Sequence, residues 1–456
     1  MESRKYLMAQ RPTKRKRLSR HQSEQFAKHQ ERKPASIVDA LNSDPVRKRI
    51  LRLLDVTDLL KLCQTSFSIR YKIQSTHWNI NTKLSRFFDD PRALRSQLGR
   101  HDALIAGSFA LQFLAGVEWL GSDCDILVKE GKRLESLSRY LISKERYKPD
   151  PPPVYQTPKD AERAMWGKCH KFHRRDGTEV QLIECLANPV WAIVEGYYTS
   201  AVYNLISWNK VISIFTRTTF VLRETVPMYR VDDYFTRLHV KYSQKGWPMR
   251  TRSPYVTPES FAPPGYWTEF GPDVCPRRVG DRVSWKMSLD TTGVVKPSTP
   301  DFVLESSCFD VHPPTGRTSS VLESDLHYYV EETNRYRSPA LRYNYVRGSL
   351  FPFEIGGLLT RSILAQYDKL EPSDDRDCWY KGCRDQKMEE RTLAKLIETR
   401  AIFHIDSSRI AGWDFQDDLI RQYFIDQDEK DRSNRRLKRD LAIDWGQSEN
   451  EVMKDT

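Results

Sequence analysis

The sequence predicts an α+β protein, and three features carry this prediction. Short apolar runs typical of strands lie at residues 104–106 and 123–128 and again at 179–185. Between them, apolar residues recur at helical spacing over residues 109–114 and 134–142. The chain has 456 residues, of which 39% are hydrophobic and 11% aromatic, which is enough for two or three domains with buried cores.

The first 36 residues differ in composition from the rest of the chain. Residues 1–36 are polar, lack apolar periodicity and contribute +8 of the chain's formal charge of +12. We therefore expect a disordered basic tail. Within it, Lys14-Arg15-Lys16-Arg17 is similar to a nuclear import signal, and the alternative is a solvated tail that touches RNA or acidic surfaces without specificity. The expected localisation is nuclear or cytoplasmic.

Residues 37–98 are expected to form a small helical segment. Ile50, Leu53 and Leu54 are spaced to share one helix face, and Asp58 opens a second amphipathic pattern. The run ILRLLDVTDLLKLCQTSFSIRYKI resembles the middle and end of an F-box, a three-helix motif that docks onto a Skp-type adaptor of cullin ubiquitin ligases. The resemblance implies such an adaptor as a partner. The leucine-proline opening of the motif is absent, and the alternative is a helical bundle that packs on the next domain.

The residues that carry chemistry lie in the next predicted domain, residues 99–216. Gly107-Ser108 follows an apolar run and would open a helix, whose free backbone N–H groups and positive dipole end suit a phosphate. Asp123 and Asp125 are two residues apart on a predicted strand, so both carboxylates project from one face. Such a pair suits Mg²⁺, which prefers oxygen ligands and keeps substrate phosphates in its coordination shell. This pattern outlines a nucleotidyl-transfer site.

The same residues resemble the signature of the DNA polymerase beta-like nucleotidyltransferase superfamily, a glycine-serine turn at a helix start followed by an acidic pair on the next strand. More narrowly, the chain is similar to uncharacterised fungal proteins in which an F-box-like segment precedes a nucleotidyltransferase-like domain. The resemblance implies a mixed sheet with flanking helices over residues 99–216. It also implies that Gly107 and Ser108 hold a nucleoside triphosphate (NTP), while Asp123 and Asp125 bind Mg²⁺.

In the superfamily, a third carboxylate on a further strand completes the metal site and acts as base towards the attacking hydroxyl. By resemblance, the matching position on the strand over 179–185 is Gln181, which is neutral and a poor ligand for Mg²⁺. Glu179 projects from the same strand face and is the candidate substitute, whereas Glu184 would face the other way. The predicted catalytic residues are therefore Asp123, Asp125 and Glu179.

Residues 217–425 are expected to form a loop-rich α+β region, and residues 426–456 a charged tail. Basic and aromatic residues alternate at Tyr336-Arg337 and over 342–347, a pattern that would let RNA stack there, although such aromatics more often pack inward. Eight scattered cysteines, including Cys378 and Cys383, indicate free thiols. The most membrane-like stretch, residues 104–120, is too short and too interrupted to span a bilayer.

Three functions stay open at this point. The first is a Mg²⁺-dependent nucleotidyltransferase, in which an acceptor hydroxyl on RNA, a protein or a small molecule attacks the α-phosphate of an NTP and displaces pyrophosphate. The second is a non-catalytic F-box-type interaction protein that recruits a client to a ubiquitin ligase. The third is a nucleotide-binding module without turnover. Gln181 counts against turnover, and the missing F-box opening counts against adaptor docking.

Overall fold

The computed structural model describes residues 37–151, 166–228, 233–250, 275–312, 329–330, 334–348, 353–366, 411–430 and 432–433. Tertiary contacts divide the chain into two compact units, the first ending at His77 and the second beginning at Trp78. The domain boundaries expected from the sequence, at residues 36, 98, 216 and 425, stay predictions.

The described part of the first unit is helical. Its helices are α2 (Ile37–Asn42), α3 (Asp44–Leu51), α4 (Val56–Thr65) and α5 (Phe67–Thr76). Asp55 caps α4, because its carboxylate accepts a hydrogen bond of 2.8 Å from the backbone N–H of Asp58. Helices α4 and α5 pack against each other, and Leu59 and Ile73 are buried. The helical character expected here is confirmed, while the F-box identity stays a prediction.

The second unit contains an eight-stranded sheet with the strand order β3-β4-β5-β2-β1-β6-β7-β9. Its strands are β1 (Leu104–Ala106), β2 (Cys124–Lys129), β3 (Lys148–Pro149), β4 (Trp166–His173), β5 (Glu179–Cys185), β6 (Asn204–Ile206), β7 (Lys210–Ser213) and β9 (Trp285–Ser288). Strands β2 and β5 are parallel, and the other neighbouring pairs are antiparallel. The sheet is therefore mixed, which confirms the α+β class with a mixed sheet.

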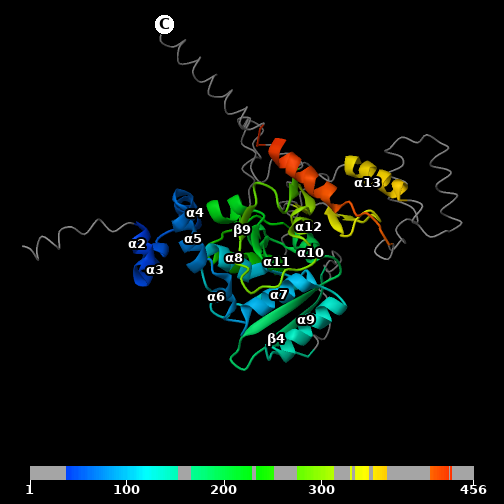
Figure 1. The fold of residues 1–456 in the computed structure, drawn as a ribbon. Coiled ribbons are helices and arrows are strands. Elements are labelled where there is room, and N and C mark those ends of the chain that lie inside the picture. The colour runs from blue at the N-terminus through cyan, green and yellow to red at the C-terminus, as the bar shows by residue number, and fades with distance from the viewer. Residues whose placement is uncertain are drawn as a thin grey trace, which may run out of the picture. The chain divides into compact units, whose positions relative to one another are not determined.

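Helices flank this sheet around its central strands. They are α6 (Ile80–Leu84), α7 (Pro91–His101), α8 (Gly107–Ala115), α9 (Lys132–Ser143), α10 (Pro189–Gly196), the short helices η1 (Ser200–Val202) and η2 (Arg217–Val221), and α11 (Asp233–Ser243). Helix α8 packs on β1, β2 and β6, α9 on β2 and β5, and α10 on β1 and β2. Helix α7 lies beside α9 (Figure 1). The apolar spacing read at Leu137 and Leu141 is the buried face of α9.

The C-terminal part of the second unit has smaller sheets. Strands β8 (Cys275–Arg278), β10 (Cys308–His312) and β11 (Tyr329–Val330) form one, and β12 (Asn334–Tyr336) pairs with β13 (Tyr345–Arg347). Helices α12 (Asp301–Glu305) and α13 (Phe353–Ala365) and a helix over residues 417–430 accompany them. A separate apolar cluster joins these elements, and its members include Tyr336, Tyr345, Ile355 and Phe424.

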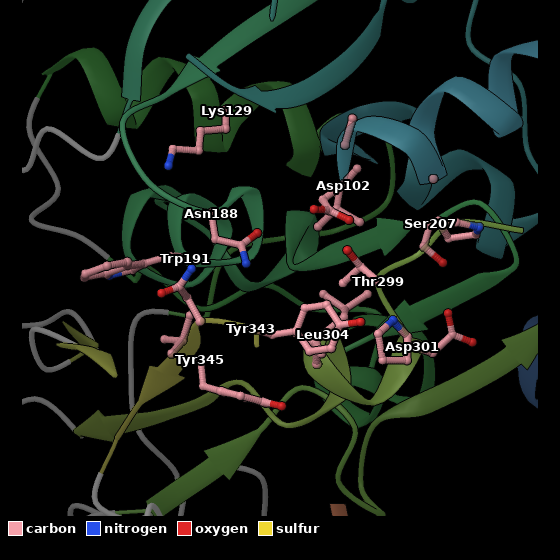
Figure 2. Close-up of a pocket in the computed structure, with 18 of the residues that line it drawn as sticks. Asp102, Lys129, Asn188, Trp191, Ser207, Thr299, Asp301, Leu304, Tyr343 and Tyr345 are labelled. Carbon is pink, nitrogen blue, oxygen red and sulfur yellow. The ribbon is translucent and has the colours of Figure 1, made fainter. Parts of the chain in front are cut away.

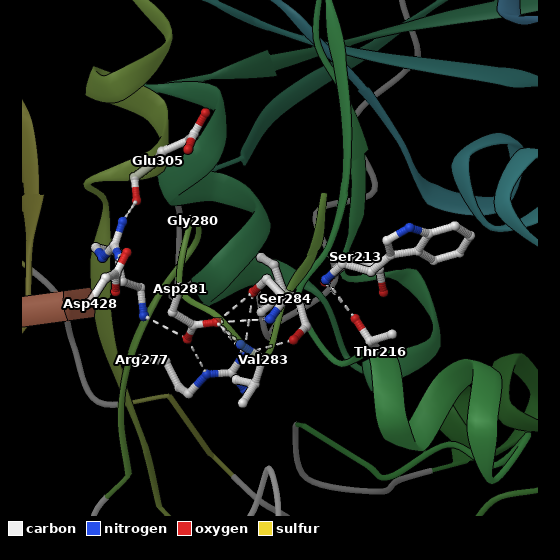
Figure 3. A network of polar contacts seen from close by, with 12 residues as sticks. Ser213, Thr216, Arg277, Gly280, Asp281, Val283, Ser284, Glu305 and Asp428 are labelled. Atoms are coloured by element: carbon white, nitrogen blue, oxygen red, sulfur yellow. Dashed lines mark hydrogen bonds and ion pairs between the residues drawn. The ribbon is translucent and has the colours of Figure 1, made fainter. Parts of the chain in front are cut away.

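Two arginines of β8 form ion pairs with acidic residues of this region, and Figure 3 shows these polar contacts. Buried Arg277 pairs with Asp281 at 2.7 Å, and Asp281 also accepts hydrogen bonds from the backbone and hydroxyl of Ser284. Arg278 reaches both carboxylate oxygens of Asp428 at 2.8 Å, which connects β8 to the helix over 417–430. These are paired, hydrogen-bonded charges of the kind that buried arginine requires.

The structure also bears on the expectations for the aromatic residues, the thiols and the membrane. Tyr336 and Tyr345 are buried in the apolar cluster, so these two rings pack inward. Cys63, Cys124, Cys169, Cys185 and Cys308 are free thiols. Among the described residues, no helix is long and apolar enough to cross a membrane. The basic run at residues 14–17 and the cysteines at 378 and 383 lie outside the described residues.

Candidate functional site

The predicted acidic pair lies in the middle of the large sheet. Asp123 immediately precedes β2, and Asp125 is the second residue of that strand. Because β2 runs between β1 and β5, Asp125 has Ala106 as its partner on one side and Gln181 on the other. The strand order thus brings the end of β1, the start of β2 and the start of β5 to one place in the sheet.

Gly107 brings the backbone of the β1–α8 turn against Asp125. The φ angle of Gly107 is +65°, a left-handed conformation that glycine adopts without the strain a side chain would bring. A Cβ atom at position 107 would overlap Oδ2 of Asp125. A glycine is therefore required both by the backbone angle and by the space that the carboxylate occupies.

Ser108 contacts the second carboxylate. Its buried hydroxyl donates to Oδ1 of Asp123 at 3.4 Å and lies 3.3 Å from the hydroxyl of Ser122. Gln112, one turn further along α8, donates to Ser122 at 2.7 Å and accepts from the backbone N–H of Trp119 at 2.7 Å. The start of α8 is thus hydrogen-bonded to the loop that leads into the acidic pair.

Gln181 holds the position where the superfamily pattern expects a carboxylate, and it links two acids. Its amide nitrogen donates to Oδ2 of Asp123 at 2.9 Å and to Oε1 of Glu179 at 2.7 Å. The amide oxygen accepts from the thiol of Cys169 at 3.1 Å. Glu179, the expected substitute, also forms an ion pair of 3.3 Å with Lys171. The structure therefore brings Asp123, Gln181 and Glu179 into one hydrogen-bonded chain.

The electrostatics of the site centre on Asp125. Burial, followed by the negative charge of Asp123, raises the pKa of Asp125 to about 7. The positive charges of Lys241 and Lys171 act in the opposite direction. With this pKa, Asp125 is partly protonated near neutral pH, and a cation that binds its carboxylate displaces the proton to solvent.

Lys241 is not a residue that the sequence pattern marks as part of the site. The helix α11 lies more than one hundred residues after β2 in the chain, and no local pattern marks Lys241 as part of the site. Aromatic residues of the same region contact one another. Trp119 stacks edge-on against Tyr242 and Trp247, with ring centroids 6.3 and 6.0 Å apart, and the ammonium of Lys245 lies 4.0 Å from the Trp119 centroid.

One buried histidine of α11 lies among these aromatics. His239 stacks edge-on against Tyr198, with centroids 5.4 Å apart, and neither of its ring nitrogens has a hydrogen-bond partner among the described residues. Burial lowers the pKa of His239 to about 4, so the ring is neutral at physiological pH. This residue adds no charge to the site.

The residues present fit Mg²⁺ in part. Asp123 and Asp125 are oxygen ligands of the type that Mg²⁺ takes, and the remaining positions would fall to water and substrate phosphates. No cluster of three or more His, Cys, Asp or Glu side chains in the described segments is arranged to hold a metal ion. Glu179 is engaged by Gln181 and Lys171, so it does not complete such a cluster.

Comparison of the chain with protein-family models, with curated proteins and with solved structures finds no match. The side chains of the acidic site and their geometry are therefore the grounds on which a function can be assigned.

Proposed function

We propose that the acidic site of the second unit binds an NTP together with Mg²⁺, in the manner of a nucleotidyltransferase. The observation that carries the proposal is the convergence of two carboxylates with the start of a helix. Asp125 lies against Gly107, and Asp123 accepts a hydrogen bond from Ser108. An acidic pair beside a helix N-terminus offers a place for a cation and, next to it, a place for the phosphates that the cation neutralises.

The roles of the side chains follow from their chemistry. Asp123 and Asp125 would hold Mg²⁺, which supplies charge neutralisation for the triphosphate when bound. The backbone at Gly107 and Ser108 would face phosphate oxygens at the start of α8. Lys241, whose charge acts on Asp125, would add positive charge for a triphosphate, whereas Lys171 forms an ion pair with Glu179.

The amide of Gln181 bears on whether this site catalyses transfer in addition to binding a nucleotide. An amide cannot take a proton from an attacking hydroxyl, and Gln181 keeps Glu179 hydrogen-bonded at 2.7 Å. We therefore propose that nucleotide binding is the main property and that transfer is slow because a base is missing. Replacing Gln181 with Glu restores a carboxylate in register with Asp125.

The test is pyrophosphate release from each NTP in the presence of Mg²⁺ or Mn²⁺, with bulk RNA or the protein itself as acceptor. We expect slow release by the wild type, loss of release in the Asp123→Asn/Asp125→Asn variant and faster release in Gln181→Glu. Asp58→Asn changes a carboxylate of the first unit and serves as a matched control. Equal release by the wild type and the double variant would contradict transfer at this site.

A second candidate function rests on the first unit. Three of its large apolar side chains are strongly exposed: Leu53 at 81%, Phe67 at 78% and Tyr71 at 65%. Phe67 and Tyr71 lie one turn apart on α5, so they share a helix face. Exposed apolar residues on such a face favour a protein partner, and the F-box resemblance suggests a Skp-type adaptor.

Adaptor docking is tested by pull-down with a purified Skp-type adaptor. We expect the wild type to retain the adaptor and Phe67→Ala/Tyr71→Ala to lose it. Ser75→Ala alters an exposed residue of the same helix and controls for general effects on α5. Failure of the wild type to bind the adaptor would contradict this candidate and leave the proposal for the second unit unaffected.

A further inference from the structure

A cavity of about 410 Å³ lies in the second unit, away from the acidic pair. Leu104 and Lys129 line it, whereas Ala106 pairs with Asp125 at the other end of β1. The cavity and the acidic site therefore lie at opposite ends of β1 and β2. Its volume falls within the range of pockets that bind small molecules, about 300–1,000 Å³.

Distant segments of the chain form the walls of this cavity (Figure 2). Lys129 and Arg133 come from the end of β2 and the start of α9, and Asn188 and Trp191 from the start of α10. The opposite wall comes from residues 297–304 and 342–346. The walls mix apolar and aromatic surface with a few polar groups, which is the usual character of a small-molecule site.

The acidic side chains in the wall are already neutralised. Asp102 forms an ion pair of 2.7 Å with Arg133. Asp301 forms an ion pair of 3.0 Å with Lys210 and accepts a hydrogen bond of 3.2 Å from the indole of Trp208. Neither acid is left to balance a further cation.

Two cationic side chains of the wall have no such partner. Neither Lys129 nor Arg342 forms an ion pair with a residue in the described ranges. The guanidinium of Arg342 lies 4.8 Å from the ring centroid of Phe415, a contact that leaves its charge in place. The cavity wall therefore carries two cationic side chains without an ion pair in the described ranges, while the nearby carboxylate of Asp417 accepts hydrogen bonds from the backbone N–H of Arg342 and the hydroxyl of Tyr345.

Asn188, at the start of α10, adds a side-chain hydrogen-bond donor at the same place. Asn188 occupies the N-cap position with an extended backbone, yet its side chain makes no capping hydrogen bond. Both Asn188 and Trp191, in the first turn of α10, line the cavity. An anion near them would gain from the partial positive charge of the helix start.

We infer that this cavity binds a small organic anion, a carboxylate or a phosphate monoester on a flat apolar body, with Lys129 and Arg342 taking the negative charge and the aromatic wall taking the body. Trp191 and Tyr343 supply the flat apolar surface. The inference rests on the cavity and its charges and is independent of the function proposed for the acidic site.

The test is calorimetric titration of the full chain with phenyl phosphate and with benzoate, using benzyl alcohol as a neutral probe of similar size. We expect saturable binding of at least one anion and binding of benzyl alcohol that is weaker by about tenfold or more. The anion that binds more tightly identifies the ligand class.

Variants assign the binding to this cavity. Lys129→Met keeps the length of the side chain without its charge, and we expect it and Arg342→Ala to weaken anion binding by about tenfold each. Lys132→Ala removes an exposed lysine of α9 that does not line the cavity, and it should bind as the wild type does. The Asp123→Asn/Asp125→Asn variant should also bind as the wild type does.

The inference would be overturned by absence of saturable binding of both anions, or by anion binding that Lys129→Met and Arg342→Ala leave unchanged. Melting curves of each variant, compared with those of the wild type, separate loss of binding from loss of folding. If one of the two variants, Lys129→Met or Arg342→Ala, melts at a lower temperature than the wild type, the binding comparison uses the other one.

Discussion

At the scale of single residues, Gly107 is the position where the start of α8 lies directly against the carboxylate of Asp125. Its φ of +65° and the position of Oδ2 of Asp125 both exclude a side chain. We expect Gly107→Ala to lower the free energy of unfolding by about 2 kcal/mol or more, through backbone strain and displacement of the carboxylate. Urea denaturation monitored by circular dichroism measures this change.

Gly121 provides the matched control for that substitution. It has nearly the same φ, +66°, but a Cβ atom there would meet no heavy atom within 4 Å. Gly121→Ala should therefore show the strain alone and a smaller loss of stability. If both variants lost the same free energy of unfolding, overlap with the Asp125 carboxylate would contribute nothing to the effect of Gly107→Ala.

The ionisation of Asp125 gives a pH-dependent prediction. Its pKa rises from 3.8 to about 7, so the stability it contributes is full below pH 3.8 and is lost as the pH rises through about 7. Asp125→Asn stays neutral at every pH. We expect the variant's advantage in free energy of unfolding to grow by about 2–3 kcal/mol from pH 5 to pH 8.

The measurement is urea denaturation of both proteins at several pH values with a chelator present, so that bound cations do not contribute. An advantage that stays constant between pH 5 and pH 8 would show that Asp125 does not titrate in this range.

Only part of the candidate site could be predicted from the sequence. Asp123, Asp125, Gly107 and Ser108 were predictable because their local spacing, together with the superfamily resemblance, indicates a strand start and a helix start, although β2 begins at Cys124, one residue after Asp123. Lys241 was not predicted because its proximity depends on the tertiary packing of α11. The bridge that Gln181 makes to Asp123 also depends on strand pairing, which one sequence does not specify.

At the scale of elements, burial explains which strands the sequence revealed. The strand β5 could be predicted because polar and apolar residues alternate at its start. The apolar residues of this pattern, such as Val180 and Leu182, are buried in the structure. The strand β4 was not predicted, because among its eight residues only Phe172 is buried. It lies near the edge of the sheet, between β3 and β5, where apolar periodicity is weak.

The connection between β8 and the helix over 417–430 makes a prediction at the same scale. Arg278 binds both oxygens of Asp428 at 2.8 Å and lies 4.8 Å from the ring centroid of Phe424. We expect Arg278→Ala to destabilise this helix by about 1–3 kcal/mol, because it leaves a partly buried carboxylate unpaired. Hydrogen exchange of the backbone amides over residues 417–430 measures the effect.

Arg421→Ala is the control, because Arg421 is exposed on the same helix. Its substitution should leave the exchange rates of the helix close to those of the wild type. Exchange that Arg278→Ala leaves unchanged would show that the pair with Asp428 does not hold the helix in place.

At the scale of the whole molecule, the second unit has the acidic pair and the cavity at opposite ends of the same two strands, β1 and β2. The acidic pair lies at the end of β1 marked by Ala106, and the cavity at the end marked by Leu104. The α+β class was predictable because it follows from local periodicity. The cavity was not, because its walls come from segments as far apart as Lys129 and Arg342.

The most direct test of the proposed nucleotide site is equilibrium binding of NTPs by calorimetry, with and without Mg²⁺, on the wild type and on Asp123→Asn/Asp125→Asn. We predict Mg²⁺-dependent binding by the wild type that increases from pH 6 to pH 8, as Asp125 loses its proton, and no binding by the variant. Binding that is independent of Mg²⁺, or equal in the two proteins, would contradict the assignment of Asp123 and Asp125 as the metal-binding pair.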